Sequence, residues 1–240
     1  MKESVDQNMV ALYDSKACDW EAQYDTPYFK DRLRVYDRWL TSIARGTVGG
    51  TVRALDIGCG TFPASAVFAQ HHISAVGVDV SPKMIEIGKA LGRNALLYDG
   101  VSLPFDGGTF SLVTMMNCIE SVTQPSELFA DILRVSQPNV KILMTINNQD
   151  ALVKKLLRLR RGQDCGSLGE WYSPYSVASL RELVAPFGFH APRVFAYSLP
   201  TLYERAPRIL RLPVFRNSYC ANNVYLEIGL SRDRRADTRG

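Results

Sequence analysis

The residues with the clearest chemical potential form the segment LDIGCGT, residues 55–61. An apolar run that predicts a strand, residues 52–57, leads directly into Gly58 and Gly60, and a helix is predicted to follow. Glycines at such a turn let the backbone bend sharply and let a ligand approach closely. The positive N-terminal end of the next helix would face the same ligand. The segment therefore predicts a ligand site at the end of the first strand.

Asp56 indicates the charge of that ligand. Nicotinamide and flavin sites use the spacing GxGxxG, but Pro63 stands here where a third glycine would be needed. Asp56 lies two residues before the first glycine, where a carboxylate repels a pyrophosphate and attracts a cation. S-adenosylmethionine bears a sulfonium and an ammonium and no phosphate, so it suits this loop better than a dinucleotide does.

Two further acids follow at the ends of predicted strands. Asp79 ends a strand predicted at residues 74–80, and Asp99 follows one predicted at residues 95–98. Asp79 can accept both hydroxyls of an adenosine ribose, and Asp99 can accept the adenine amino group. Each acid alone has an ordinary interpretation as a strand-end or capping residue. Because ligands of open parallel sheets lie beyond the carboxyl ends of the strands, the combination predicts an adenosine-containing ligand.

The elements that must position these residues alternate regularly between strand and helix. Further strands are predicted at 110–116, 140–146, 190–197 and 223–230. Helices are predicted once or twice within 10–45, at 64–71, after an N-cap at Ser81, at 126–135 and at 176–187 before Gly188. Residues 136–139 are predicted to form a turn. Strands that alternate with helices imply a mostly parallel sheet with helices on both faces.

Three more segments extend the pattern: VGVDVSPKMI (76–85), YDGVSLPFDGGTFSLV (98–113) and LRVSQPNVKILMTI (133–146). With LDIGCGT, they make the chain resemble the class I S-adenosylmethionine-dependent methyltransferases, in the branch similar to ubiquinone/menaquinone and other small-molecule enzymes. The resemblance covers about residues 50–147 well and the last third only in outline. It implies an α/β, Rossmann-like fold with a seven-stranded sheet, mostly parallel with an antiparallel last strand. It also implies methyl transfer to a small-molecule acceptor by in-line displacement, with S-adenosylhomocysteine as the product.

The resemblance gives nine residues a role in holding S-adenosylmethionine. From the methionine moiety through the ribose to the adenine they are Asp56, Gly58 and Gly60, then Asp79, then Val80, Met84, Asp99 and Gly100, with Asn117 near the methyl donor. The sequence departs from the family pattern at Phe62, where glycine is usual, and at residues 138–140, where Pro-Gly-Gly is usual. A non-catalytic cofactor-binding scaffold therefore stays an alternative, and it predicts weak or absent cofactor binding.

No catalytic base and no metal ligand are assigned from the sequence. His71 and His72 end a predicted helix and His190 lies at a helix-to-strand turn, where structural roles are favoured. Asn147 and Asn148 end the fifth strand, but no acid is predicted beside them at the end of the fourth, so a magnesium site is not expected. The five cysteines are widely spaced without a CxxC pair, which argues against zinc and against a disulfide framework.

The acceptor site is expected beneath an N-terminal helical cap, residues 1–50. The methyltransferase domain is expected at 51–240, with insertions at about 150–172 and 200–217 that cover the acceptor. Aromatic side chains of these regions could line that pocket or simply pack in the core; they are Tyr24, Tyr28, Trp171 and Tyr172.

The net charge of +4 is unevenly distributed. Residues 1–150 contain 13 Lys and Arg against 17 Asp and Glu, whereas residues 151–240 contain 15 against 7. The basic last third suggests an anionic partner or a solvated face, and it is the only support for an RNA or protein methyltransferase. Without an RNA-binding motif, nucleic acid is not favoured.

The basic amphipathic segment 151–161 could contact a membrane surface, although ordinary core packing is favoured. Without a leader or an apolar run long enough to span a bilayer, a cytoplasmic location is expected.

Overall fold

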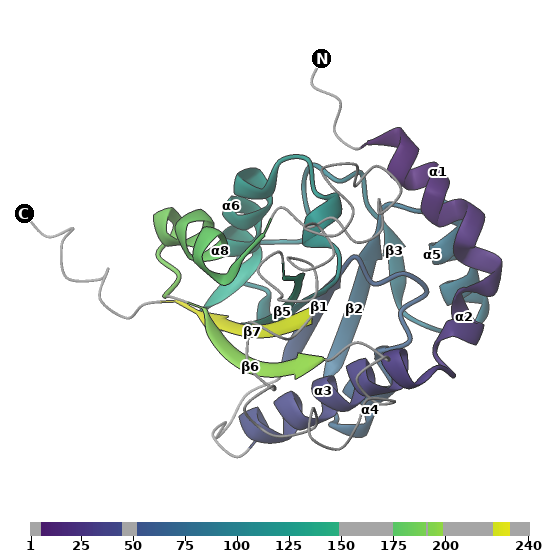
Figure 1. The fold of residues 1–240 in the computed structure, drawn as a ribbon, viewed down its shortest axis with the longest axis horizontal. Coiled ribbons are helices and arrows are strands. Elements are labelled where there is room, and N and C mark those ends of the chain that lie inside the picture. Colours follow the sequence, from purple (N-terminus) through teal and green to yellow (C-terminus); the bar gives the residue numbers. More distant parts are fainter. Residues whose placement is uncertain (1–5, 45–51, 149–174, 191, 199–222, 231–240) are drawn as a thin grey trace, which may run out of the picture.

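A computed structural model describes residues 6–44, 52–148, 175–190, 192–198 and 223–230, which include one seven-stranded sheet (Figure 1). The strands are β1 (Arg53–Ile57), β2 (Ser74–Asp79), β3 (Ala95–Leu97), β4 (Phe110–Met116), β5 (Ser136–Asn147), β6 (Arg193–Ser198) and β7 (Asn223–Gly229). Their spatial order is β3-β2-β1-β4-β5-β7-β6. β7 pairs antiparallel with β5 and β6, and the other pairs are parallel. The predicted Rossmann-like sheet with an antiparallel last strand is therefore confirmed.

Helices pack on both faces of this sheet. They are α1 (Gln7–Lys16), α2 (Trp20–Gln23), α3 (Pro27–Ala44), α4 (Ser65–Gln70), α5 (Pro82–Ala90), α6 (Pro125–Val135) and α8 (Val177–Val184), with 3₁₀ turns η1 (Ala17–Asp19), η2 (Ile119–Ser121) and η4 (Ala185–Phe187). One face packs against α6 and α8 through Ile132 and Leu180. The other packs against α3 and α4 through Trp39 and Phe68. Alternate residues of each strand therefore enter two separate cores.

The N-terminal segment contains more helices than the sequence predicted. Residues 10–45 were expected to form one or two helices, but α1, α2 and α3 are distinct and η1 joins the first two. Pro27 begins α3, because proline lacks the N–H that the first helical position leaves unpaired. Tyr36, Leu40 and Ile43 form a buried apolar stripe along α3.

Residues 136–139 form the start of β5, so the predicted turn is wrong. Ser136 pairs with Phe110, and the next pair joins Lys141 with Leu112. Between these two pairs, residues 137–140 of β5 lie opposite the single residue Ser111 of β4, so β5 contains a bulge there. A bulge accommodates Pro138, which has no N–H to donate to the neighbouring strand.

Local end signals place the remaining helices as expected. Ser81 caps α5 by accepting a hydrogen bond from the backbone N–H of Met84, at 3.2 Å. Gly188 ends η4 in the left-handed conformation, with φ of 80°. The predicted helix 151–161 and the predicted insertions lie outside the described residues. None of the helices in the described part of the chain combines the length and apolar character that crossing a bilayer requires.

Candidate functional site

The loop after β1, residues 58–61, is here named the glycine loop. The backbone N–H groups of Gly58 and Cys59 both donate to the carbonyl of Val78, at 2.9 and 3.1 Å. Gly58 has φ of +69°, and a Cβ there would lie 2.4 Å from the Cβ of Cys118. Gly60 has φ of +57°, so it also occupies the left-handed region that other residues rarely adopt. Both glycines are therefore required by the backbone itself.

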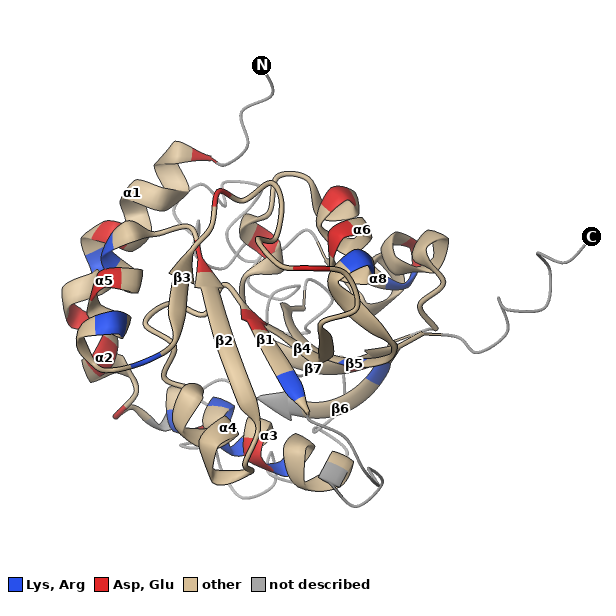
Figure 2. Ribbon diagram, turned by 180° about the vertical axis from the view of Figure 1, so that it is seen from behind, with Lys and Arg blue, Asp and Glu red and all other residues tan. Residues whose placement is uncertain are grey.

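Asp79 joins the glycine loop to the start of α5. Its Oδ2 accepts the N–H of Gly60 at 2.8 Å, and its Oδ1 accepts the N–H of Ser81 at 2.9 Å. Burial raises the pKa of Asp79, and the backbone hydrogen bonds act in the opposite direction. Figure 2 shows acidic positions at the ends of β1 and β2, at the same edge of the sheet. The carboxylate is thus held by two strand-end segments.

Asp56 is almost fully buried at the end of β1, with 3% of its surface exposed. Its Oδ1 accepts hydrogen bonds from the Tyr36 hydroxyl at 2.8 Å and the Thr114 hydroxyl at 2.6 Å. Burial raises the pKa of Asp56 to about 6, although the bonds from Thr114 and Tyr36 lower it. This carboxyl group can therefore change its charge near neutral pH.

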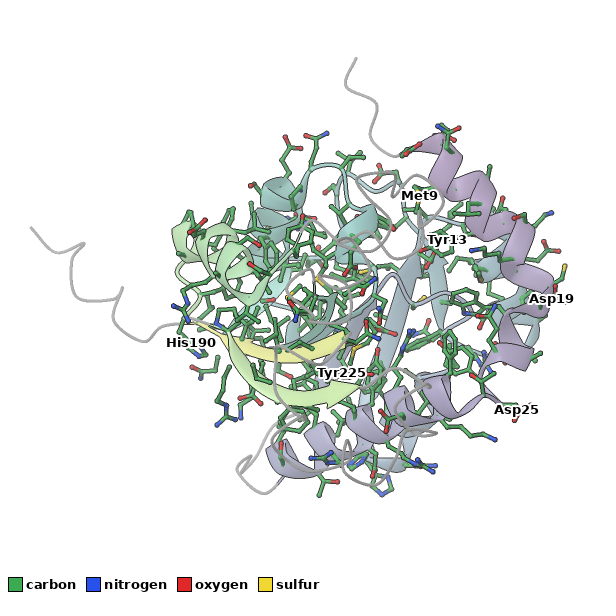
Figure 3. All side chains as sticks on the ribbon, in the orientation of Figure 1. Met9, Tyr13, Asp19, Asp25, His190 and Tyr225 are labelled. Carbon is green, nitrogen blue, oxygen red and sulfur yellow. The ribbon has the colours of Figure 1, made fainter. Side chains whose placement is uncertain are left out.

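A cavity of about 820 Å³ lies above the carboxyl ends of β1, β2, β4 and β5. The helices α1, α2 and α3, here named the N-terminal cover, form its other wall. Figure 3 shows Met9 and Tyr13 on the side of α1 that faces the sheet. The cavity brings together eight of the nine residues predicted to bind the cofactor, namely Asp56, Gly58, Gly60, Asp79, Val80, Met84, Gly100 and Asn117.

Asp99 is the predicted residue that the structure does not place in the cavity wall. It is exposed, and its Oδ1 accepts the backbone N–H groups of Val101 at 2.9 Å and Ser102 at 3.2 Å. Its neighbours Tyr98 and Gly100 do line the cavity. The proposed contact of Asp99 with the adenine therefore stays a prediction.

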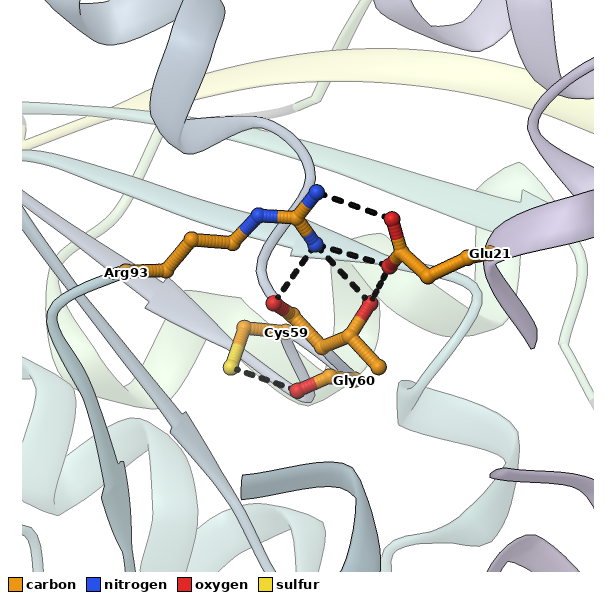
Figure 4. A network of polar contacts seen from close by, with 5 residues as sticks. Glu21, Cys59, Gly60 and Arg93 are labelled. Atoms are coloured by element: carbon orange, nitrogen blue, oxygen red, sulfur yellow. Dashed lines mark hydrogen bonds and ion pairs between the residues drawn. The ribbon is translucent and has the colours of Figure 1, made fainter. Parts of the chain in front are cut away.

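Polar contacts tie the N-terminal cover to the glycine loop and to α5. Glu21 of α2 forms a bidentate ion pair with Arg93, at 2.7 and 2.8 Å, and accepts a hydrogen bond from the Thr61 hydroxyl (Figure 4). Burial raises the pKa of Glu21, but the bonds from Arg93 and Thr61 outweigh it and leave the pKa lowered. Asp14 of α1 accepts a hydrogen bond from the Ser81 hydroxyl. Sequence patterns did not reveal these contacts, because their partners are far apart in the chain.

Phe62 lies in the core and outside the cavity wall. Its side chain is fully buried and packs against Phe68, with ring centroids 6.3 Å apart. Its backbone has φ of +61°, the conformation that glycine would adopt here without strain. The departure from the family pattern therefore alters core packing behind the glycine loop.

Glu120 is a cavity residue that sequence reasoning missed. It lies on η2, and its Oε1 accepts the backbone N–H of Asn147 at 2.6 Å. The expectation that no acid accompanies Asn147 at the end of the fourth strand was wrong, because η2 turns Glu120 back toward β5. Its position four residues after Met116, the last residue of β4, was the available signal. Within the described ranges, no group of three or more His, Cys, Asp or Glu side chains could hold a metal ion.

The other residues considered from the sequence have more ordinary positions. His71 contacts Asp37 at 2.9 Å, and the His190 N–H donates to the carbonyl of Gly229 at 2.9 Å, far from α1 (Figure 3). Tyr24 lines the cavity. The side chain of Tyr28 and the residues Trp171 and Tyr172 lie outside the described part.

Comparisons with known proteins agree with this geometry. A family model described as “Methyltransferase domain” matches residues 28–191. The demethylmenaquinone methyltransferase of Renibacterium salmoninarum is 32% identical over 111 residues, covering 45% of this chain and 46% of that relative. The match thus spans about half of the relative's length.

Two solved structures show the same fold. A putative methyltransferase of Haloferax volcanii, in complex with the Trm112 methyltransferase activator, has a TM-score of 0.61 at 19% identity, covering 91% of this chain and 96% of that one. A possible histamine N-methyltransferase of Thermotoga maritima has a TM-score of 0.61 at 15% identity, covering 92% and 99%. Because the family model covers more than half of the sequence, the chain belongs to the class I S-adenosylmethionine-dependent methyltransferases, enzymes of the EC 2.1.1 class whose cofactor is S-adenosylmethionine.

Proposed function

We propose that this protein transfers a methyl group from S-adenosylmethionine to a small-molecule acceptor. The observation that supports it best is the cavity of about 820 Å³, whose wall contains eight residues expected from the family motifs. Its volume falls within the range of pockets that enclose small molecules. The cavity also extends beyond these residues to η2 and the end of β5, which leaves space for an acceptor.

The residues present fit the cofactor. Gly58, Gly60 and Asp56 would lie against the methionine moiety. The two hydrogen bonds described for the Asp56 carboxylate, from Tyr36 and Thr114, both end on Oδ1. Asp79 would accept the ribose hydroxyls. Among the described residues, the buried Oδ1 of Asn117 has no hydrogen-bond partner, as expected for a group that faces a ligand.

The adenine would lie beside the remaining predicted residues. We propose that Val80 and Met84 flank the ring and that Asp99 and Gly100 meet its edge. Val80, Met84 and Gly100 line the cavity, which supports this arrangement. The Oδ1 of Asp99 accepts the backbone N–H groups of Val101 and Ser102, so a contact with the adenine requires that these two hydrogen bonds be replaced by one to the ligand.

The chemistry requires positioning above all. The bound cofactor supplies a methyl group on a positively charged sulfur, which is intrinsically reactive toward a nucleophile. The chain's own contribution is to hold the acceptor in line with that group, which replaces an encounter in solution. The N-terminal cover forms the wall of the cavity opposite the strand ends, where it would limit the access of water to a bound acceptor. A base is needed only where the acceptor must lose a proton.

We propose that residues 1–50 act as a cap on a methyltransferase domain at 51–240. The insertions at about 150–172 and 200–217 would cover the acceptor side, and segment 151–161 offers a peripheral membrane contact for a hydrophobic acceptor. A cytoplasmic, biosynthetic role is part of the same proposal.

The scaffold alternative depended on Phe62, which lies in the core and not in the cavity wall. An RNA or protein acceptor has only the charge of the last third in its favour.

Calorimetric titration with S-adenosylmethionine and S-adenosylhomocysteine tests the proposal. We expect micromolar binding of both ligands, and a loss of at least about tenfold in affinity for Asp79→Ala, because two ribose hydroxyls lose a charged partner. Asp106→Ala, at an exposed loop position, is the matched control and should bind normally. Absence of binding to either ligand would refute the proposal and favour the scaffold.

A further inference from the structure

The N-terminal cover presents a row of aromatic side chains to the cavity, and the cofactor motifs do not explain them. Tyr13, Trp20, Tyr24 and Phe29 all line the cavity. Their rings contact one another, with centroids 6.1 Å apart for Tyr13 and Trp20, 5.9 Å for Trp20 and Phe29, and 4.7 Å for Phe29 and Tyr24. These four residues therefore form one continuous surface, here named the aromatic wall.

Trp20 is the member of the aromatic wall that reaches the glycine loop. A Cβ added to Gly60 would lie 2.7 Å from Nε1 of Trp20, 3.3 Å from its Cε2 and 3.6 Å from its Cδ1. The indole ring therefore packs directly against the backbone of Gly60. Its Nε1–H is buried and has no hydrogen-bond partner among the described residues. Trp20 thus contributes its ring, and not a hydrogen bond, to this part of the site.

Tyr13 lies next to Trp20 and close to Asp79. Figure 3 shows Tyr13 on the side of α1 that faces the sheet. Burial is the main cause that raises the pKa of Tyr13, and the charge of Asp79 acts in the same direction, so the two groups are close enough to interact. The phenol is therefore neutral at ordinary pH. Because Asp79 accepts the N–H of Gly60 at 2.8 Å, Tyr13 and Trp20 lie beside neighbouring parts of the site.

The covalent structure of S-adenosylmethionine limits where its sulfonium can lie. The sulfur joins the methionine chain to the ribose. In the proposed function the methionine moiety lies against Gly58 and Gly60, and the ribose hydroxyls bind Asp79. The sulfur would therefore lie between these contacts, which the hydrogen bond from Gly60 to Asp79 keeps close together. Tyr13 and Trp20 are the aromatic side chains beside both of them.

An aromatic surface suits a sulfonium. This cation has no N–H or O–H group to donate, and aromatic faces attract such groups, most strongly where water is excluded. Phe29 of the aromatic wall already holds a cation in this way, because the guanidinium of Arg32 lies over its ring, 4.5 Å from the centroid. Asp56 and Asp79 attract a sulfonium too, but Lys16 and Arg32 also line the cavity. The net charge of the cavity wall therefore does not by itself select the cation.

We propose that the rings of Tyr13 and Trp20 bind the sulfonium of S-adenosylmethionine and make the site prefer the cofactor to the product S-adenosylhomocysteine. The two ligands differ by one methyl group and its positive charge. This proposal rests on the proposed methyltransferase function and adds to it a discrimination between cofactor and product. Transfer of the methyl group leaves a neutral sulfur, so the attraction to the rings ends and the product is released more readily.

The ratio of two dissociation constants tests this proposal. Calorimetric titration of the full chain with each ligand gives the ratio within one protein, so general damage to the site cancels. We expect the wild type to bind S-adenosylmethionine at least about fivefold more tightly than S-adenosylhomocysteine. Trp20→Leu keeps an apolar side chain without a ring, so the preference should fall to about twofold or less. Trp20→Phe keeps a ring and removes no hydrogen bond to a described residue, so the preference should stay above about threefold.

Two further changes complete the experiment. Phe187→Leu is the matched control, because Phe187 stacks on Phe129 and does not line the cavity, and it should keep the wild-type ratio. Tyr13→Leu is a second, independent variant should Trp20→Leu fail to fold, and it should lower the ratio as well. Tyr13→Phe, which keeps the ring and loses only the hydroxyl, should preserve it.

The outcomes separate the two proposals. Failure of the wild type to bind either ligand refutes the proposed function itself, whereas equal affinities for the two ligands overturn the role of the rings alone. A preference that persists in Trp20→Leu also overturns it, because the carboxylates then select the cation. A loss that Trp20→Phe does not reverse has the same meaning. Loss of the preference in the leucine variants, with binding of S-adenosylhomocysteine retained, supports the rings as the sulfonium contact.

Discussion

The glycine loop and the N-terminal cover face each other across one cavity, but they are built differently. The glycine loop depends on backbone geometry, with positive φ angles and N–H bonds to Val78 and Asp79. The N-terminal cover is attached through side chains, such as Glu21 with Arg93 and Tyr36 with Asp56. A change in the loop should therefore abolish cofactor binding, whereas a change in the cover should only weaken it.

The largest effect is expected for Gly58→Ala. The added Cβ would lie 2.4 Å from the Cβ of Cys118 in a left-handed backbone, so the loop must move. We expect a loss of about 2–4 kcal/mol in the free energy of unfolding, and no calorimetric binding of S-adenosylhomocysteine.

Gly92→Ala is the matched control for this prediction. Gly92 has a similar φ of +72°, but nothing lies within 4 Å of an added Cβ. It should cost about 1–2 kcal/mol of stability and leave the affinity unchanged. Equal affinities for the two variants would show that close packing at the loop does not govern binding.

An intermediate effect is expected from pH, through Asp56 at the junction of loop and cover. Because burial raises the pKa of Asp56 to about 6, the group is largely protonated near pH 5 and ionised near pH 7. Only the carboxylate attracts the ligand's ammonium, and that attraction lowers the pKa in the complex. Affinity for S-adenosylhomocysteine should therefore rise with pH, by up to about tenfold for each pH unit below pH 6.

Asp56→Asn provides the test of that assignment. The variant should bind more weakly at neutral pH and show a flatter profile in calorimetric titrations across the same range. Burial also raises the pKa of Asp79, so any contribution of Asp79 to the profile has the same direction. A profile as steep as that of the wild type would assign the titration to another group.

The smallest effect is expected in the cover, for Glu21→Gln. This change removes the ion pair with Arg93 but keeps an oxygen for the Thr61 hydroxyl. We expect a three- to tenfold loss of affinity, roughly, mainly through faster dissociation in stopped-flow measurements. Asp25→Asn removes an exposed pair with Lys30 and should change neither rate. A complete loss of binding in Glu21→Gln would remove the distinction between loop and cover.

Local signals explain why much of the site could be predicted. Gly58, Gly60 and Asp79 are recognised because strand ends, tight turns and carboxylates follow one another at short spacing. Glu120 was not recognised, because its contact with Asn147 depends on η2 turning it toward β5. The error at residues 136–139 had a similar origin, since proline and asparagine normally favour a turn, and only pairing with β4 made the segment a strand.

The sequence by itself determined the alternation of strands and helices, the family and the residues at the carboxyl ends of β1 and β2. These depend on apolar periodicity and on backbone conformations that act over a few residues. Only the tertiary structure decided that Phe62 lies in the core, that Asp56 is bonded to Tyr36 and Thr114, and that Glu120 lines the cavity and accepts the N–H of Asn147. Such contacts join residues far apart in the chain, and their energies exist only when the whole sheet and its cover are assembled.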